Sequence, residues 1–310
     1  MKNLSLLMGL VAAGATTAAL AGNVQVVLED GRLRVRGDED GNRMFLLQLP
    51  SGNVLAIGND GTTINGQRAV GFPPTALVDV RVTLGGGRDT IALGGLVVGN
   101  DIIINTGDAD DAISQTNLPI TVGRNMVLRT GAGGDSFTLD NLFIAGDLDI
   151  ADPAGVTFGT LTDFQVTGNV NIVVADADGA IILTDGSADA GMLIDSSTSG
   201  GSISVNRVVT GPMTITMGGD ISIAQVSDAT VAGDFVVQLG EEFDAWLVDN
   251  TEVSGDIVAE TGGDDDLLFG ANVNAAGTLF LDGGDGIDSL TADGLTGAEG
   301  EMIINIEIVE

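Results

Sequence analysis

The feature that most constrains this sequence is a repeat of about 22 residues. A glycine followed by a short strand of alternating apolar residues returns at nearly constant steps along most of the chain. The repeat glycines are Gly99, Gly123, Gly146, Gly168, Gly191, Gly211, Gly233, Gly255, Gly277 and Gly300. One such unit is too small to bury its apolar face alone, so neighbouring units must stack on one another. The repeat therefore predicts a solenoid.

The strands inside each unit are short and rich in β-branched residues, and Gly, Asp and Asn separate them. This pattern is typical of β-strands and turns rather than helices. Three such strands fit into one unit, whereas a left-handed hexapeptide helix needs shorter coils. Parallel crossovers are also right-handed in nearly all proteins. We therefore predict an all-β fold, a right-handed parallel β-helix of about ten coils over residues 77–310.

Two columns of side chains are expected to run through the stacked coils. The first is apolar and lies two residues before the repeat glycine, at Val97, Ile144, Val166, Val209, Val231 and Val253. The second is acidic and follows a Gly-rich turn, at Asp89, Asp111, Asp135, Asp244, Asp266 and Asp288. An apolar residue comes two positions after each of these aspartates. One of these apolar residues is Trp246, the single tryptophan, which we expect in the core rather than in a ligand site.

The two ends of the chain differ from the repeat. Residues 22–76 are expected to form an N-terminal β-hairpin cap, because an uncovered solenoid end presents strand edges that aggregate. The expected strands are Val24–Leu28, Leu33–Arg36, Met44–Leu49 and Val54–Ile57, with a boundary at Phe72–Pro74. At the other end, Met302–Val309 is expected as one last strand. Glu301, Glu307 and Glu310 there discourage end-to-end self-association without abolishing it.

Residues 1–21 are typical of a secretory signal peptide. Lys2 precedes an apolar run from Leu4 to Leu20, and small residues lead to Ala21. We expect cleavage after Ala21, because the run is short for a transmembrane anchor and no basic segment follows it. The mature protein is therefore predicted to be secreted, extracellular or at the cell surface, and not inserted in a membrane. Cysteine is absent, so stability must come from burial, hydrogen bonds or metal binding.

The chain is strongly acidic, with 44 Asp and Glu residues against 11 Lys and Arg and a net charge of −33. After Arg129, the one cationic side chain is Arg207. Such a surface repels nucleic acid and anionic lipid, and it attracts divalent cations or a basic surface protein. Acidity with few aromatic residues also occurs in disordered chains, but a hydrophobic fraction of 44% predicts a folded core.

One Gly-Asp turn of the acidic column carries a local motif. Residues 283–291 read Gly-Gly-Asp-Gly-Ile-Asp-Ser-Leu-Thr, which resembles the calcium-binding nonapeptide of the RTX (haemolysin-type) family. The chain also resembles the acidic, Gly-Asp-rich β-helices that bacteria secrete. The RTX resemblance implies calcium between neighbouring turns, with ligands at Gly283, Asp285 and Asp288 and, from the preceding coil, Asp264 and Asp266. RTX arrays repeat as nonapeptides, whereas this chain has one full match within a longer period.

The spacing of the acidic column is a separate reason to expect cations. Equivalent aspartates on adjacent coils lie about 4.8 Å apart in a stacked sheet. Two carboxylates at that distance repel each other, and a hard divalent ion with oxygen ligands reverses this cost. Asp111 and Asp135 are therefore candidate calcium ligands in the N-terminal coils. The alternative is that Gly and Asp occur here because both favour turns.

Parallel β-helices often host polysaccharide lyases and hydrolases, which need Lys, Arg or His beside their carboxylates. This chain has no His, and Lys2 is its one lysine. Asp110-Asp111 and Asp264-Asp265-Asp266 offer paired carboxylates for glycoside chemistry, but they lie in repeated turns, which indicates structure. We therefore predict no catalytic residues and no enzyme activity.

The favoured function is that of a structural or adhesive extracellular protein that calcium stabilises. The alternative is a module that binds a glycan, a cell-wall or matrix polymer, or another surface partner through a flat β-face. A polysaccharide-active enzyme is the least favoured class.

Overall fold

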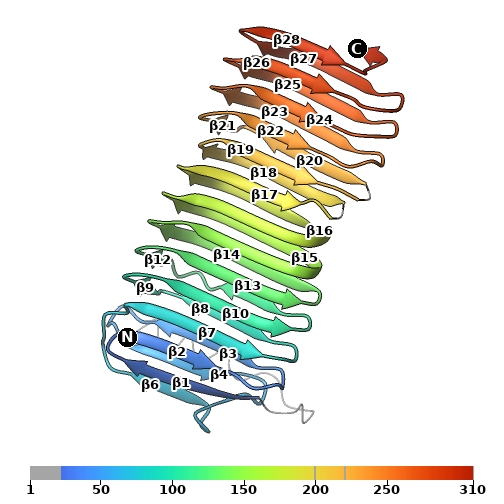
Figure 1. The fold of residues 1–310 in the computed structure, drawn as a ribbon. Helices are drawn as coiled ribbons and strands as arrows, with labels where there is room; N and C mark the ends of the chain where they lie inside the picture. The colour runs from blue at the N-terminus through green and yellow to red at the C-terminus, as the bar shows by residue number, and fades with distance from the viewer. Residues whose placement is uncertain (1–21, 199, 220, 310) are drawn as a thin grey trace.

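The computed structural model describes residues 22–198, 200–219 and 221–309 of the chain. In this part the strands stack as parallel coils into a β-solenoid of about ten coils with a period near 22 residues (Figure 1). This confirms the all-β solenoid that the repeat predicts. None of the described residues belongs to a helix long and apolar enough to cross a membrane. The predicted signal peptide, residues 1–21, lies outside the described residues.

Strands β1–β6 belong to the N-terminal segment, and β7–β29 belong to the coils that follow. The N-terminal strands are β1 (Asn23–Glu29), β2 (Arg32–Arg36), β3 (Arg43–Gln48), β4 (Val54–Gly58), β5 (Thr63–Ile64) and β6 (Ala69–Phe72). The next strands are β7 (Asp79–Gly85), β8 (Thr90–Gly94), β9 (Val97–Val98), β10 (Ile102–Asp108), β11 (Ala112–Gln115), β12 (Ile120–Val122), β13 (Met126–Ala132), β14 (Asp135–Ile144), β15 (Leu148–Val166), β16 (Asn169–Ala188), β17 (Gly191–Ser196) and β18 (Gly201–Thr210). The last are β19 (Met213–Met217), β20 (Ser222–Ser227), β21 (Thr230–Val231), β22 (Phe235–Gln238), β23 (Ala245–Val253), β24 (Ile257–Glu260), β25 (Leu267–Ala275), β26 (Thr278–Asp282), β27 (Ser289–Gly297), β28 (Gly300–Ile304) and β29 (Ile308–Val309).

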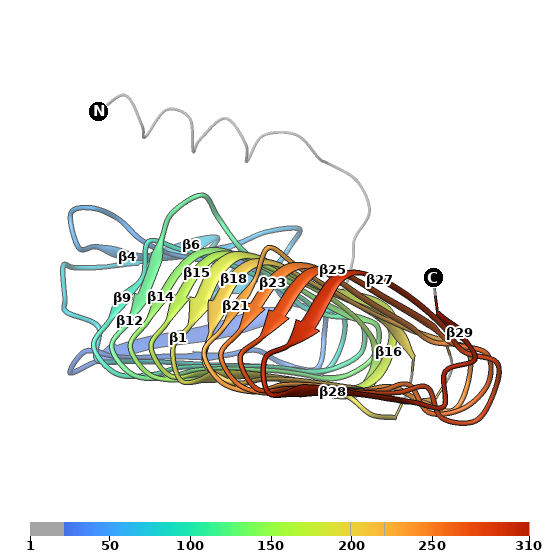
Figure 2. The same ribbon diagram turned by 90° about the horizontal axis from the view of Figure 1, so that it is seen from above.

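The rod has three faces, because each full coil supplies three strands, such as β10, β11 and β12. Face 1 contains β2, β7, β10, β13, the first parts of β15 and β16, then β17, β19, β22, β24, β26 and β28. Face 2 runs from β3 through β8 and β11 to β29, and face 3 contains β9, β12 and the last parts of the long strands. Seen along the rod, β28 of face 1 lies in one layer and β23, β25 and β27 lie in the opposite layer (Figure 2).

Inward side chains of equivalent strands stack on one another through the rod. On face 1, Ile102 aligns with Met126 and then with Leu148, and all three are buried. On face 2, the apolar residues that follow the acidic column are also buried, as predicted: Ile91, Ile113, Phe137, Trp246, Leu268 and Leu290. Trp246 is a core residue, as expected. The alternation of inward and outward side chains has the period of two that strands impose.

The predicted apolar column before the repeat glycine is partly wrong. Its buried members are Ile144, Val166, Val231 and Val253. Val97 and Val209 point outward instead, with exposed fractions of 59% and 55%, and the register places Val98 and Thr210 in the column. In these two coils the glycine follows the column residue directly, and a shift of one residue along a strand reverses the face of every side chain.

Residues 22–76 form antiparallel hairpins and also supply the first coil. β1 pairs with β2, β3 pairs with β4, and β4 pairs with β6, all antiparallel. β2 pairs in parallel with β7, and β3 pairs in parallel with β8. The segment therefore joins the stack on faces 1 and 2, in addition to the covering role that the sequence pattern predicts.

The last coil ends in two strands, β28 and β29, where the sequence pattern predicts one. Asn305 between them has a positive φ of 53° and turns the chain. The register aligns Glu301 with Leu279, so a carboxylate takes the place of an inward apolar side chain in the final coil. Glu307 accepts a hydrogen bond from the backbone N–H of Asp288 at 2.9 Å. Glu310 lies outside the described residues.

Candidate functional site

The acidic column is a ladder of carboxylates inside the rod. Its six members, which we call the aspartate ladder, are all buried: Asp89, Asp111, Asp135, Asp244, Asp266 and Asp288. One carboxylate oxygen of each accepts a hydrogen bond from a backbone N–H one coil earlier. Asp111 Oδ1 accepts this bond from Asp89 at 2.7 Å, and Asp135 Oδ1 accepts it from Asp111 at 2.7 Å. Asp244, Asp266 and Asp288 repeat the pattern at 2.7–2.8 Å.

Glycine turns stack tightly before the ladder residues. Gly107 and Gly131, which align on neighbouring coils, have φ values of 109° and 99°, a conformation that glycine adopts at low cost. A Cβ atom on Gly131 would lie 1.7 Å from the carbonyl oxygen of Gly107, so these turns leave no room for a side chain. The chain then enters the next strand with the aspartate on its inner side.

Smaller residues interrupt the ladder in the middle coils. The register places Thr157 next to Asp135, and further on it aligns Gly201 with Ser222. The Thr157 hydroxyl donates a hydrogen bond to Asp152, which is also buried. The ladder pattern resumes where the Ser222 N–H donates to Asp244. The column therefore keeps its position through the rod, but its aspartates form two separate groups.

Burial raises the pKa of the ladder carboxyls, because removal from water disfavours their charged form. The pKa rises to about 7 for Asp89 and Asp266 and to about 6 for Asp111. The hydrogen bond from the backbone N–H lowers the pKa in part, and a neighbouring ladder carboxylate raises it again.

The second oxygen of five ladder residues is buried and accepts no hydrogen bond of normal geometry from the described residues, although the side chains of Asn42, Thr106, Thr130 and Thr261 lie near enough to lower the pKa of four of these carboxyls in part. These oxygens are Oδ2 of Asp89, Asp111, Asp135, Asp266 and Asp288. An unpartnered buried charge is costly, and the cost falls when a proton or a cation neutralises it. The contribution of the ladder to stability therefore depends on whether its carboxyls are protonated.

The ligands that the RTX resemblance implies fall into an inner and an outer group. The inner group is Asp266, Asp288 and the Gly283 carbonyl, and the outer group is Asp264 and Asp285. The Gly283 oxygen already accepts a hydrogen bond from the Thr261 hydroxyl at 2.9 Å. Asp264 and Asp285 are exposed on the turns. Among the residues that the structure describes, no three acidic side chains are grouped closely enough to hold a metal ion.

The paired carboxylates of the turns face in opposite directions. Asp111 and Asp266 point into the rod, as ladder residues. Their neighbours Asp110 and Asp265 are exposed, and each accepts a backbone N–H on the next coil, at 3.0 and 2.9 Å. Glycoside hydrolysis needs two carboxylates on either side of one bond, and these neighbouring residues do not offer that arrangement.

Sequence reasoning missed a second column, at a corner of the rod. Its members have left-handed backbone conformations: Asn141, Asp163, Asp185, Arg207, Asp228, Asn250, Asn272 and Gly294. Asn and Asp tolerate this conformation better than most residues. Their side chains also bond from coil to coil, as Asn250 does to Asp228 and Arg207 to Asp185. The signal in the sequence was a run of Asn and Asp at the repeat spacing.

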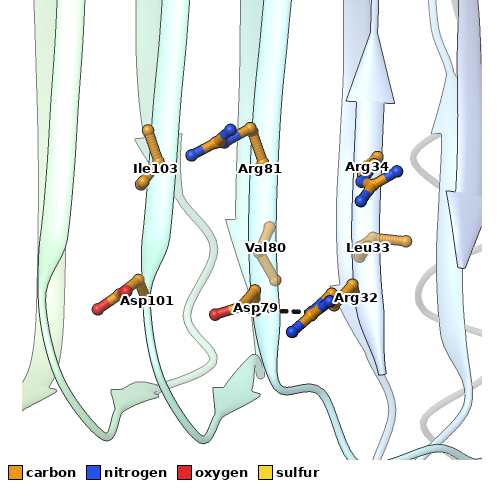
Figure 3. A pocket seen from close by; sticks show the side chains of 8 residues that line it. All are labelled: Arg32, Leu33, Arg34, Asp79, Val80, Arg81, Asp101 and Ile103. Carbon is orange, nitrogen blue, oxygen red and sulfur yellow. Dashed lines mark hydrogen bonds and ion pairs between the residues drawn. The ribbon is translucent and has the colours of Figure 1, made fainter. Parts of the chain in front are cut away.

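A shallow depression of about 250 Å³ lies on face 1 across β2, β7 and β10, and it carries several arginines (Figure 3). Arg32 forms an ion pair with Asp79 at 3.2 Å. Arg34 and Arg81 are aligned on neighbouring strands, and both are exposed. Like charges side by side in a sheet repel each other, so this surface favours a negatively charged partner.

Comparisons with protein families, with curated proteins and with solved structures found no match to this chain.

Proposed function

We propose that the chain is a secreted structural or adhesive protein of the extracellular space, without enzyme activity. The aspartate ladder supports this proposal most strongly, because its carboxylates bond one coil to the next. Its repeated bonds to the backbone indicate a role in holding coils together. A rod of laddered coils is suited to spacing or attachment, where length and rigidity matter.

Calcium is the proposed stabilising ion, bound at the Gly-Asp turns of the last coils. The buried oxygens of Asp266 and Asp288 without partners are hard donors of the type that calcium prefers. Asp264 and Asp285 add negative charge at the outer side of the same turns. A bound ion would neutralise carboxylates that are costly to bury, and this gain would appear as resistance to unfolding.

A thermal melt tests the calcium proposal. We expect the unfolding midpoint of residues 22–310 to rise with millimolar calcium and to fall with EDTA. The rise should disappear in Asp264→Asn/Asp285→Asn and in Asp266→Asn/Asp288→Asn. It should persist in Asp163→Asn, a control that removes an exposed carboxylate elsewhere. An unchanged midpoint in calcium would refute calcium binding and leave the structural role standing.

Binding of a glycan or another surface partner through a flat face is the second candidate function. Arg34 and Arg81 are aligned and form no ion pair with the described residues, which favours this candidate and indicates an acidic polymer. Co-sedimentation with an acidic polysaccharide tests this candidate. Binding that Arg34→Ala/Arg81→Ala abolishes would support it, and absence of binding would exclude it.

A further inference from the structure

One outward row of side chains on face 1 runs the length of the rod and changes charge along it. We call it the outer row. Its N-terminal part is Arg36, Thr83, Asn105 and Arg129, aligned on β2, β7, β10 and β13. Its later part is Asp195, Thr216, Gln238 and Glu260, aligned on β17, β19, β22 and β24, and the row then ends with Asp282 on β26 and Ile304 on β28. Ala151 and Val173 join the two parts.

The two arginines of the outer row are exposed and lack a partner charge. In the part of the chain that the structure describes, Arg32, Arg43, Arg88, Arg124 and Arg207 form ion pairs with aspartates. Arg36 and Arg129 are not among them, although the chain carries a net charge of −33. Carboxylates are abundant in this chain, yet these arginines on one flat face are not paired with them. They are therefore suited to pair with negatively charged groups of another molecule.

The later part of the same row is the mirror of its first part. Arg36 and Arg129 are separated by three strand steps, and so are Asp195 and Glu260. When the later part is taken in reverse order, each arginine of the first part corresponds to a carboxylate, Arg36 to Glu260 and Arg129 to Asp195. The two positions between them hold one threonine and one amide side chain in each part. Face 1 therefore carries both halves of a self-complementary pattern.

We propose that face 1 is the interface of an antiparallel dimer of this chain. A two-fold axis parallel to the strands, between β15 and β16, places Arg36 of one copy opposite Glu260 of the other. The same axis places Arg129 opposite Asp195, and it brings Ala151 and Val173 together at the centre. Each contact occurs twice, as in any isologous interface.

The size of the face fits this arrangement. On the next outward row, the same axis places Val127 opposite Leu193, and it places Arg81 and Arg34 opposite Val236 and Val258. Ten strands at about 4.8 Å, with a width of about 15 Å, give roughly 700 Å² per partner. This approaches the area of about 800 Å² per partner that stable interfaces bury. The overall negative charge of the two copies opposes association, and salt of physiological strength screens that repulsion.

A charge swap tests the proposal. Residues 22–310 should sediment as a dimer in physiological salt. The variants Arg36→Glu/Arg129→Glu and Asp195→Arg/Glu260→Arg should each dissociate, with affinity weakened more than roughly tenfold. An equimolar mixture of the two should restore a dimer, because every contact between the different variants then joins opposite charges. Restoration would also show that both variants fold.

The control is Arg43→Glu/Arg88→Glu, which makes the same change of charge away from face 1 and should leave the dimer intact. A wild-type chain that stays monomeric at high concentration would overturn the proposal. So would a mixture that fails to associate, or polyanion binding by a monomer that Arg36→Glu/Arg129→Glu abolishes. The last result would assign the arginines to an acidic polymer. None of these outcomes depends on calcium.

Discussion

At the residue scale, the aspartate ladder combines two functions in one side chain. Oδ1 accepts a backbone N–H that the turn leaves without a partner in its own coil, and Oδ2 is buried without a hydrogen bond. The first property explains why an oxygen acceptor recurs at this position. The second makes stability depend on whether the carboxyl is charged.

The acceptor function predicts a specific loss of stability. Asp111→Ala leaves the buried N–H of Asp89 without its acceptor, and we expect a cost of about 1–3 kcal/mol in the free energy of unfolding. Asp111→Asn keeps an acceptor oxygen and resembles the protonated carboxyl, so it should be at least as stable as wild type at pH 8. Urea denaturation measures both. Asp110→Ala, at the exposed neighbour, is the control and should cost less; equal losses for the two alanine variants would contradict a special role of Asp111.

The raised pKa values predict that stability falls as pH rises. Between the ordinary pKa near 4 and the folded values of about 6 to 7, the folded chain binds more protons than the unfolded chain. The ladder's contribution is therefore complete near pH 4, and it is lost as pH rises through 6 to 7. Without calcium, the thermal midpoint should decline from pH 4 to pH 8.

General repulsion among the acidic groups acts in the same direction, and high salt reduces it. The ladder's share is the part that persists in high salt and that Asp89→Asn/Asp266→Asn removes. A midpoint that rises from pH 5 to pH 8 in high salt would contradict the pKa shifts.

The sequence predicted the position of the ladder but not its chemistry. The regular spacing of Asp89 and Asp111 implied stacking, and stacked carboxylates suggested cations. Whether an aspartate points into the rod depends on the turn before it, and the bond to the preceding coil's N–H depends on how two coils are offset. Neither is encoded in spacing: the repeat places Asp266 and not Asp264 in the column, but it does not show that Asp266 enters the rod while Asp264 stays exposed on the turn.

At the element scale, the turns rather than the strands set the closeness of the coils. The strands tolerate many different β-branched residues. The turn at Gly131 tolerates no side chain at all, because a Cβ atom there would lie 1.7 Å from the carbonyl oxygen of Gly107 on the preceding coil. A different turn, at the repeat glycine, explains where sequence reasoning failed on face 3. The repeat glycine marks each unit, but its distance from the strand varies by one residue, which exchanged Val97 for Val98 and Val209 for Thr210.

The close approach of the turns predicts that Gly131→Ala is severely destabilising. The substitution combines a positive φ with a clash against the backbone, and we expect a loss above about 3 kcal/mol. Gly66→Ala separates the two causes. Gly66 also has a positive φ, 74°, but no atom lies within 4 Å of its Cβ position, so its loss should be about 1–2 kcal/mol. Similar losses at both positions in urea denaturation would show that crowding contributes little.

At the scale of the whole molecule, the two ends of the rod are protected differently. Antiparallel hairpins cover the first coil, whereas the last coil has no cover among the described residues and leaves Met302, Ile303 and Ile304 exposed. Glu301 stands there in the inward column that Leu279 occupies one coil earlier. An inward charge at an edge strand is a known obstacle to edge-to-edge pairing.

The position of Glu301 predicts that one substitution opens the rod to end-to-end association. Glu301→Leu restores the apolar column, so the exposed edge of β28 should pair with the same edge of a second copy. The measurement is sedimentation velocity in the Arg36→Glu/Arg129→Glu background, where face 1 does not contribute. Glu299→Leu removes the same charge from the preceding turn, outside the column, and should remain monomeric. Association of both variants would attribute the effect to net charge, and association of neither would mean that other features of the last coil protect it.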